Sequence, residues 1–390
     1  MVFQPLDFYK IDDLLNEEEL LIRNTARRFA NDEVIPVIAE HWEAATFPKE
    51  MIQQMGDLGF LGPFVPAEYG GAECSYTMYG LICQELERGD SGVRSFCSVQ
   101  GSLVMYPILH FGSEEQKKEY LPKLASGEFV GCFGLTEPDA GSDPGSMITR
   151  AKKDGSDWIL NGAKMWITNG TMADIAVVWA KDESGKIRGF IVHKDDKGFS
   201  APEMVHKVSL RASVTSELVL EDVRIPAERE LPNTSGLKSP LMCLTSARYG
   251  IAWGATGALQ GVLDEAIQYT QERVQFGKPV ASFQITQAKL ADLATDLTNS
   301  QLMVYRLGRL VDSGKMKHYH VSMAKRHNVN VALEGARKVR GMLGANGISL
   351  DYQAIRHMCN LESVQTYEGT YEVHTLILGE HLTGLSAFGN

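Results

Sequence analysis

A single glutamate stands out in the segment TYEGTYEVH, residues 366–374, which lies between two stretches with helical spacing of apolar residues. Glu368 follows the aromatic Tyr367 and precedes Gly369, so the pattern predicts a carboxylate on a tight turn. A carboxyl group shielded by aromatic rings has a raised pKa and can act as a base near neutral pH. Because most glutamates are solvated, an exposed and inactive Glu368 is the alternative interpretation.

A lone arginine lies in a long, otherwise uncharged stretch. Arg94 is the only charged residue between Asp90 and Glu114. A buried guanidinium needs an anionic partner, and Glu87 lies seven residues earlier, on the same face if one helix spans both. One interpretation is a structural Glu87–Arg94 ion pair. The other is a carboxylate-binding Arg94 that Glu87 holds ready.

The segment GCFGLTEPDAGSDPGS, residues 131–146, combines hydroxyl groups with glycines. Glycine lets the backbone approach a ligand closely, and such a loop offers N–H donors to a phosphate or a heteroaromatic ring. The same composition is typical of a surface turn, which is the alternative. The residues that would form the ligand loop are Thr136, Ser142, Ser146, Gly134, Gly141 and Gly145.

The segment WILNGAKMWIT predicts two short strands around an Asn161-Gly162 turn. After that turn, Trp166 and Thr168 share one face of the second strand, opposite Ile167. A Trp and a Thr on one face could stack on a flat cofactor and hydrogen-bond to it. A plain sheet core is the alternative, because aromatic and β-branched residues favour strands in any case.

Hydrophobic periodicity divides the chain into three regions that would have to position these residues. Residues 1–128 show helical spacing, including a helix over 111–126 with Ser113 as its N-cap. Residues 129–235 contain short strands joined by turns, without intervening helices, and predict an antiparallel sheet or barrel. Residues 236–390 contain long amphipathic helices typical of an up-down bundle. The expected fold class is therefore α+β, mostly α.

Composition excludes several classes of protein and site. Asp and Glu number 49 against 38 Lys and Arg, and a net charge of −11 disfavours nucleic acid as a partner, since that affinity rests on neutralising phosphates. The 6 cysteines form no CxxC pair and the histidines no HExxH, so no metal site is expected. The GxGxxG, GxxxxGK[ST] and GxSxG motifs are missing, which argues against a Rossmann dehydrogenase, a P-loop enzyme and an α/β-hydrolase.

The longest weakly charged stretch runs from Ser91 to Ser113. It contains Gln100, Pro107 and His110, which favours a buried helix and connection over a membrane span. The N-terminal segment MVFQPLDFYKIDDLLNEEELL has no basic region followed by an apolar one, so no signal peptide is expected. Scattered single cysteines fit a reducing compartment.

Several segments together resemble the acyl-CoA dehydrogenase family: FGLTEPDAGSD, WITNG, RVQFGKP with Gln284 beyond it, MLGANGI and TYEGT. They follow the family's order and spacing over nearly the whole chain. Within the family, ELERGDSGVRSFCSVQGSLVMYPI, KVSLRAS, ARYGIAWG and IRHMCNLESVQTYEGT are most similar to the glutaryl-CoA dehydrogenase branch. The resemblance implies an N-terminal helical domain (1–128), a central antiparallel β domain (129–235) and a C-terminal four-helix bundle (236–390).

The resemblance also implies FAD, bound between the β domain, the bundle and a neighbouring subunit of a homotetramer. Three of the matching residues, Arg273, Phe276 and Gln284, would reach the FAD of the adjacent subunit. The residues that match the family's FAD-binding positions are Phe133, Leu135, Thr136, Gly141, Ser142, Trp166, Ile167, Thr168, Arg273, Phe276, Gln284, Gly344, Thr370 and Glu372.

Glu368 matches the family's catalytic base, which implies that it removes the α-proton of an acyl-CoA thioester while a hydride passes from the β-carbon to flavin N5. The Glu368 backbone N–H and a ribityl hydroxyl of FAD would polarise the thioester oxygen. Arg94 resembles the residue that binds the distal carboxylate of glutaryl-CoA. The expected substrate-binding residues are Glu87, Arg94, Ser95, Ser98, Ser142, Arg248 (toward coenzyme A) and Tyr367.

Oxidation of glutaryl-CoA would give glutaconyl-CoA, and loss of its γ-carboxylate as CO2 would give crotonyl-CoA. Four alternatives stay open: a non-decarboxylating glutaryl-CoA dehydrogenase, a short-chain acyl-CoA dehydrogenase with a structural Arg94, an acyl-CoA oxidase, and a non-catalytic flavin- or CoA-binding scaffold. The family implies electron-transferring flavoprotein as the acceptor. It also implies the cytoplasm in a bacterium or the mitochondrial matrix in a eukaryote.

Overall fold

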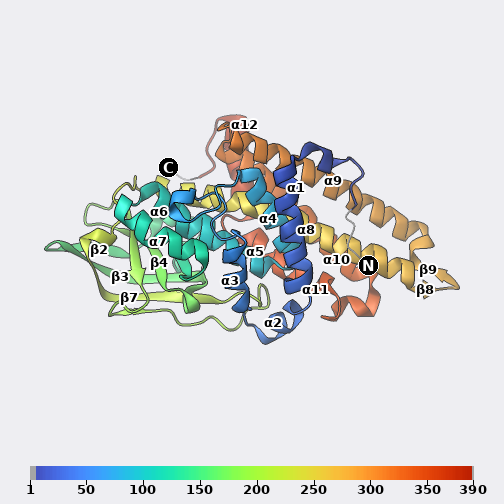
Figure 1. Cartoon of the computed structure of the whole chain (residues 1–390), viewed down its shortest axis with the longest axis horizontal. Coiled ribbons are helices and arrows are strands. Elements are labelled where there is room, and N and C mark those ends of the chain that lie inside the picture. The colour runs from blue at the N-terminus through green and yellow to red at the C-terminus, as the bar shows by residue number, and fades with distance from the viewer. Residues whose placement is uncertain (1–5, 389–390) are drawn as a thin grey trace.

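The computed structural model describes residues 6–388, and residues 1–5 and 389–390, at the ends of the expected first and third regions, lie outside the described part. The chain forms helices, then a sheet, then helices again (Figure 1). This order agrees with the expected α+β class. The N-terminal helices are α1 (Glu17–Phe29), α2 (Ile38–Ala44), α3 (Glu50–Asp57), α4 (Tyr76–Gly89), α5 (Ser91–Ser98), α6 (Tyr106–Phe111) and α7 (Glu114–Ser126).

Helix α7 begins where the sequence places it. Ser113 is its N-cap: the Ser113 hydroxyl accepts from the Gln116 N–H, and the Gln116 side chain accepts from the Ser113 N–H. This reciprocal box satisfies two N–H groups that a helix start leaves without partners. The weakly charged stretch from Ser91 onward is buried through α5 and the π-helical turn η4 (Val99–Met105), as expected. No described helix is both long and apolar enough to cross a bilayer.

Glu87 and Arg94 do not lie on one helix. The sequence placed them on the same face only if a single helix spans both, and this condition is not met. Helix α4 ends at Gly89, and Asp90 has the extended backbone angles φ −165° and ψ 141°. The Asp90 side chain then caps α5 by accepting from the Gly92 N–H at 2.6 Å. An aspartate that prefers a cap to a helix interior therefore breaks the helix between the two residues.

The central sheet consists of β1 (Gly131–Gly134), β2 (Arg150–Asp154), β3 (Asp157–Thr168), β4 (Ile175–Lys181), β5 (Ile187–His193), β6 (Phe199–Ser200) and β7 (Thr215–Ile225). Most pairs are antiparallel, but the sheet is mixed because β4 pairs in parallel with β1 and, through Arg150 and Lys181, with β2. The expectation of a purely antiparallel sheet is wrong at this edge. The hairpin β2–β3 separates β1 from β4 in sequence and is long enough to make a crossover connection.

The Asn161-Gly162 pair is not a turn. Strand β3 runs through it, and the pairing with β7 shifts register between Leu160 and Gly162 as a β-bulge. Gly162 has φ +147°, and an added Cβ would lie 2.5 Å from Thr149 Oγ1. Glycine is therefore required here by a bulge and a close contact. An Asn-Gly pair in the sequence does not show whether the glycine serves a bulge or a hairpin turn. The expected hairpin around Gly185 is present between β4 and β5.

Strand β4 is buried on both faces of the sheet. Along β4, Val177 and Trp179 pack in the core that includes the N-terminal helices, whereas Ala176 and Val178 pack in a second core within the β region. This alternation follows from the two-residue period of a strand. A third core fills the C-terminal helices.

The C-terminal region contains α8 (Lys238–Glu272), α9 (Gln284–Asp312), α10 (His318–Met342), α11 (Gln353–Thr366) and α12 (Tyr371–Thr383). Helix α8 packs against α9, α10 and α11, and also against α4 of the N-terminal region. A small hairpin, β8 (Val274–Gln275) and β9 (Lys278–Pro279), joins α8 to α9. Figure 1 places this hairpin at the opposite end of the molecule from β2 and β3.

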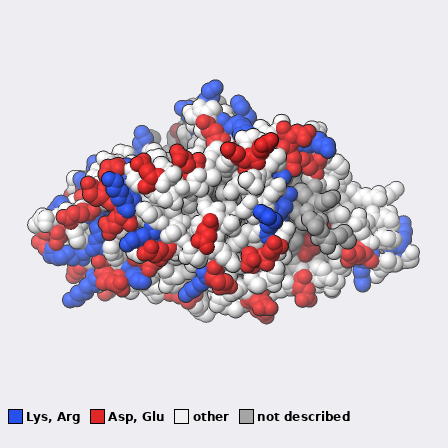
Figure 2. Space-filling model, viewed as in Figure 1, with Lys and Arg blue, Asp and Glu red and all other residues white. Residues whose placement is uncertain are grey.

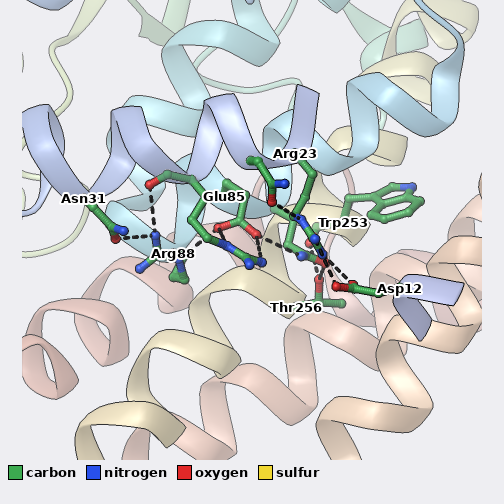
Figure 3. Close-up of polar contacts among 10 residues, drawn as sticks. Asp12, Arg23, Asn31, Glu85, Arg88, Trp253 and Thr256 are labelled. Carbon is green, nitrogen blue, oxygen red and sulfur yellow. Dashed lines mark hydrogen bonds and ion pairs between the residues drawn. The ribbon is translucent and has the colours of Figure 1, made fainter. Parts of the chain in front are cut away.

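Buried charges join the N-terminal helices to one another (Figure 3). Glu85 on α4 accepts from Arg27 on α1 at 2.8 Å and from Arg88 at 3.0 Å. Arg88 also donates to Asn31 Oδ1 at 2.7 Å. Because a buried charge is tolerated only when paired, this network fixes α4 against α1, and α4 is the helix that carries Glu87.

Candidate active site

The loop between α11 and α12 contains the glutamate singled out from the sequence. Helix α11 ends at Thr366, and Thr370 caps α12 by accepting from the Val373 N–H at 3.3 Å. Glu368 has φ +51° and Gly369 has φ +94°, so the chain makes the tight turn that the sequence predicts. A non-glycine residue in this conformation is costly and is held in place by its surroundings.

Two buried cations from neighbouring helices contact this turn. Lys325 on α10 donates through Nζ to the carbonyl oxygen of Tyr367 and, at 2.6 Å, to that of Gly369. Arg248 on α8 donates through Nε to the carbonyl oxygen of Glu368 at 2.7 Å. Three successive carbonyl groups of the turn are thus hydrogen-bonded to cationic side chains. Both side chains are buried, so these contacts are shielded from water.

The Glu368 carboxyl group lies in an environment that disfavours charge. Its Oε2 is fully buried and has no hydrogen-bond partner among the described residues. Burial raises the pKa of Glu368, while the nearby Lys325, Arg94 and Arg248 act in the opposite direction. A buried carboxylate oxygen without a hydrogen-bond partner, with a raised pKa and cations nearby, has the properties of a general base.

Arg94 is buried, with 1% of its surface exposed, and is paired as the sequence predicts. Its Nε donates to Glu87 Oε2 at 2.6 Å, and Ser91 Oγ donates to Glu87 Oε1 at 2.9 Å. Arg94 Nη2 donates to the hydroxyl of Tyr367, the residue that precedes Glu368. The arginine and the glutamate of the turn therefore belong to one site. Among the described residues, no hydrogen bond is recorded for Arg94 Nη1.

The Glu87–Arg94 pair depends on a glycine in α8. A Cβ added at Gly254 would lie 1.9 Å from Glu87 Oε2 and 3.1 Å from Arg94 Nε. We expect Gly254→Ala to lower the free energy of unfolding by about 1–3 kcal/mol, because neither buried partner has room to move. Urea unfolding of the purified variants measures this. The matched control is Gly379→Ala in α12, where an added Cβ meets nothing within 4 Å and no loss is expected; equal midpoints for the two variants would contradict the prediction.

The remaining candidate substrate residues lie in three places. Ser95 and Ser98 are buried on α5 beside Arg94, and Tyr367 contacts Arg94 directly. Arg248 contacts the backbone of the turn, whereas the resemblance places it toward coenzyme A. Ser142 lies apart from them, exposed in the loop after β1.

The loop after β1 is anchored by an ion pair that sequence reasoning missed. Glu137 is buried and accepts from Lys164 Nζ at 2.7 Å, from the Ile148 N–H at 2.6 Å and from the Thr149 N–H at 3.0 Å. Burial lowers the pKa of Lys164 to about 8. A surface turn would not need a buried carboxylate, so the loop is more constrained than its composition indicates.

The candidate cofactor residues of this loop differ in exposure. Phe133 and Leu135 are buried, and Thr136 is half-buried. Gly141 is exposed, and an added Cβ there would meet nothing within 4 Å. The inner half of the loop therefore packs into the core, and the outer half leaves backbone and hydroxyl groups accessible.

Trp166 lies beside this loop, because the Met165 N–H donates to the Thr136 carbonyl at 2.8 Å. Trp166 has φ +63° at an irregularity in β3, and 59% of its surface is exposed, so it is not part of a plain sheet core. Ile167 points the other way and is buried, as the two-residue period predicts. Thr168 is half-buried.

Other candidate cofactor residues lie in separate parts of the chain. Thr370 and Glu372 begin α12, next to the Glu368 turn. Gly344, with φ +63°, starts the turn after α10. The residues expected to reach an adjacent subunit are exposed at the far hairpin: Arg273, Phe276 and Gln284.

Lys325 and Glu137 are the site residues that the sequence did not reveal. Lys325 lies in the segment VSMAKRHNV, where a lysine is typical of an exposed helix face. Lys325 lies on the buried side of α10 with its neighbours Val321, Ala324 and Asn328. The apolar Val321 and Ala324 beside it in the sequence were the available signal that this lysine is buried.

Comparison with known proteins agrees with the fold. The chain matches three family models: acyl-CoA dehydrogenase N-terminal domain over 16–128, middle domain over 132–223 and C-terminal domain over 234–383. It is 36% identical over 373 residues to the human mitochondrial short-chain specific acyl-CoA dehydrogenase, covering 94% of this chain and 90% of the human protein.

Two solved structures are also similar. A glutaryl-CoA dehydrogenase from Mycobacterium smegmatis in complex with FADH2 is 50% identical, with a TM-score of 0.97 and 100% of both chains covered. A structure described as the electron transferring flavoprotein of Acidaminococcus fermentans is 36% identical, with a TM-score of 0.92, covering 97% of this chain and 100% of that one. With the three regions, the buried glutamate turn and these matches taken together, the chain belongs to the acyl-CoA dehydrogenase family.

Proposed function

We propose that this protein is an FAD-dependent dehydrogenase that oxidises glutaryl-CoA and decarboxylates the product to crotonyl-CoA and CO2. The observation that carries the proposal is the contact between Arg94 and Tyr367, which joins a buried cation to the turn that bears Glu368. A base for the α-carbon and a cation for a distal carboxylate then lie in one site. The similarity to the glutaryl-CoA dehydrogenase of Mycobacterium smegmatis supports the choice of substrate.

The residues present fit FAD. An exposed indole at Trp166 offers a flat surface, and the nearby loop leaves the backbone at Gly141 open. Phe133, Leu135, Thr136, Ser142, Ile167 and Thr168 would hold the cofactor on this side, with Gly344, Thr370 and Glu372 toward the bundle and Arg273, Phe276 and Gln284 from a neighbouring subunit. When bound, FAD supplies the acceptor for a hydride from the substrate β-carbon.

Glu368 removes the α-proton of the thioester. The charge that develops on the thioester oxygen needs a donor, and the structure records no hydrogen bond from the Glu368 N–H to another described residue, so this group is available. Burial around Glu368 excludes water from the transfer. Arg94 and Ser95 hold the distal carboxylate, and Ser98 lies one helical turn beyond Arg94.

After oxidation, the γ-carboxylate leaves as CO2, because the electron pair of its broken C–C bond is delocalised into the conjugated thioester. Protonation of the resulting carbanion gives crotonyl-CoA. Glu368, protonated in the first step, is placed to return that proton. Electron-transferring flavoprotein is the proposed acceptor of the electrons.

A short-chain acyl-CoA dehydrogenase is the second candidate. It is favoured by the likeness to the human short-chain enzyme and by the fact that Glu87 and Tyr367 already bind two nitrogens of Arg94. An assay with an artificial electron acceptor separates the two functions by comparing glutaryl-CoA with butyryl-CoA. Faster turnover of glutaryl-CoA, with crotonyl-CoA as product, supports the proposal. Preference for butyryl-CoA overturns the substrate assignment, and accumulation of glutaconyl-CoA overturns the decarboxylation.

Self-association as a homotetramer is part of this proposal. Phe276, at the tip of the β8–β9 hairpin, is 94% exposed, and Val274 and Ile285 nearby are also exposed. Figure 2 shows charged side chains of both signs at both ends of the molecule, more densely over the sheet end than at this one. An apolar tip of this kind is typical of an interface.

Replacing Phe276 with Glu is expected to weaken assembly and to lower the FAD content per chain, because a charge cannot be buried unpaired in an interface. Light scattering coupled to gel filtration gives the mass, and absorbance gives the flavin ratio. Val208→Glu is the control, since Val208 is a comparably exposed apolar residue in another region. A Phe276 variant with the mass and flavin content of the parent protein would refute the assignment of this tip to an interface.

A further inference from the structure

We propose that Lys325 is a positioning residue that holds the Glu368 turn in its productive conformation through hydrogen bonds to the carbonyl groups on either side of Glu368. This inference rests on the proposed function, which makes Glu368 the base. Lys325 comes from α10, 43 residues before Glu368, and its side chain is buried with 1% exposed. A lysine so deeply buried needs a reason, because removing an ammonium group from water is costly.

The geometry gives the reason. Lys325 Nζ donates to the carbonyl oxygens of Tyr367 and Gly369, the residues on either side of Glu368. One ammonium group can bind both oxygens only if the two carbonyl groups point to the same side of the turn. The Glu368 carbonyl instead accepts from Arg248 on α8. The two cations thereby fix the orientation of three successive peptide groups and hold Glu368 at φ +51°.

A third contact leaves little room for the turn to relax. Gly369 lies against His374 of α12 and Arg248, and an added Cβ would lie 3.1 Å from a nitrogen of each side chain. His374 is itself held by Ser322 of α10, with Nδ1 and Oγ 3.1 Å apart. The turn is therefore enclosed by α8, α10 and α12, and Lys325 is the side chain that bonds to both of its ends.

Lys325 also affects the charge of the base. The charged groups around Glu368 are Lys325, Arg248 and Arg94, with Glu87 paired to Arg94, and the titratable Tyr367 and His374 flank the turn. Burial lowers the pKa of Lys325, while the Glu368 carboxylate opposes that change. An ammonium at this position favours the carboxylate form of Glu368. Its loss is expected to favour the protonated, inactive form.

The test compares Lys325→Met, which keeps the length of the side chain and removes its donors and charge, with Lys325→Arg, which keeps a cation. We expect kcat of Lys325→Met to fall about 100-fold, with KM changed less than about threefold and the acidic limb of the kcat–pH profile moved to higher pH. Lys325→Arg should recover part of kcat and return the limb toward its wild-type position. Lys338→Met on the exposed face of α10 is the matched control and should behave as the parent protein.

Amide hydrogen exchange tests the positioning role without reference to activity. In Lys325→Met, the peptide spanning residues 361–375 should exchange faster than in the parent protein, while peptides from α4 and the sheet are unchanged. Unchanged exchange in that peptide overturns the proposal. If Lys325→Met does not fold, Lys325→Gln, uncharged but still polar, takes its place in the same measurements.

The kinetic arm uses whichever of glutaryl-CoA and butyryl-CoA the parent protein oxidises. If it oxidises neither, the proposed function fails, whereas the exchange comparison still decides the role of Lys325. A folded, FAD-loaded Lys325→Met with parental kcat and an unmoved acidic limb contradicts the proposal whatever the substrate.

Discussion

Replacement of Glu368 by Gln is expected to lower kcat for acyl-CoA oxidation by about 10²–10⁴-fold, the contribution typical of a positioned general base. Gln has nearly the same shape and can keep the backbone contacts to Arg248 and Lys325, so the turn and FAD binding should be retained. Stopped-flow reduction of the bound flavin by the acyl-CoA substrate measures the effect.

The pH dependence gives the same prediction an independent check. Burial raises the pKa of Glu368, and the base works only when ionised, so activity of the parent protein should decline as pH falls through a pKa above that of an exposed glutamate. Glu362→Gln, an exposed change on α11, is the control and should leave rate and profile unchanged. A Glu368→Gln protein that reduces its flavin at the parental rate would exclude Glu368 as the base.

The second large effect is expected at Arg94. Replacing it with Gln should lower kcat/KM for glutaryl-CoA at least about 100-fold, because a buried cationic partner of the substrate carboxylate is lost. Butyryl-CoA has no distal carboxylate, so its kcat/KM should change far less. The ratio of the two specificity constants, measured with an artificial acceptor, is therefore the informative quantity.

Arg94 is also the partner of Glu87, so its loss leaves a buried carboxylate unpaired and is expected to destabilise the fold by about 3–5 kcal/mol. The double variant Glu87→Gln/Arg94→Gln removes both charges and should regain part of that stability without regaining glutaryl-CoA turnover. Recovery of glutaryl-CoA turnover in the double variant would mean that Arg94 is structural and does not bind the substrate.

The sequence predicted the parts of the site that depend on neighbouring residues in the chain. The turn at Glu368 could be predicted because Gly369 lies beside it. The order of helices, strands and helices followed from periodicity. The family resemblance added the cofactor and the expected roles of residues that no local pattern indicates.

Features that depend on distant parts of the chain could not be predicted in this way. Gly162 was expected in a turn and lies in a bulge, because the contact that requires it is with Thr149 across the sheet. The parallel pairing of β1 with β4 depends on where a whole hairpin packs. The buried contacts of Lys325 and Glu137 are with partners 42 and 27 residues away, which no local pattern reveals.

The most direct test of the central claim is an anaerobic titration of the FAD-loaded protein with glutaryl-CoA, with the products identified by mass spectrometry. Glutaryl-CoA is expected to bleach the flavin absorbance and to yield crotonyl-CoA and CO2. A flavin that stays oxidised in the presence of excess glutaryl-CoA, while butyryl-CoA reduces it, would contradict the assignment of Arg94 as the carboxylate-binding residue of a glutaryl-CoA dehydrogenase.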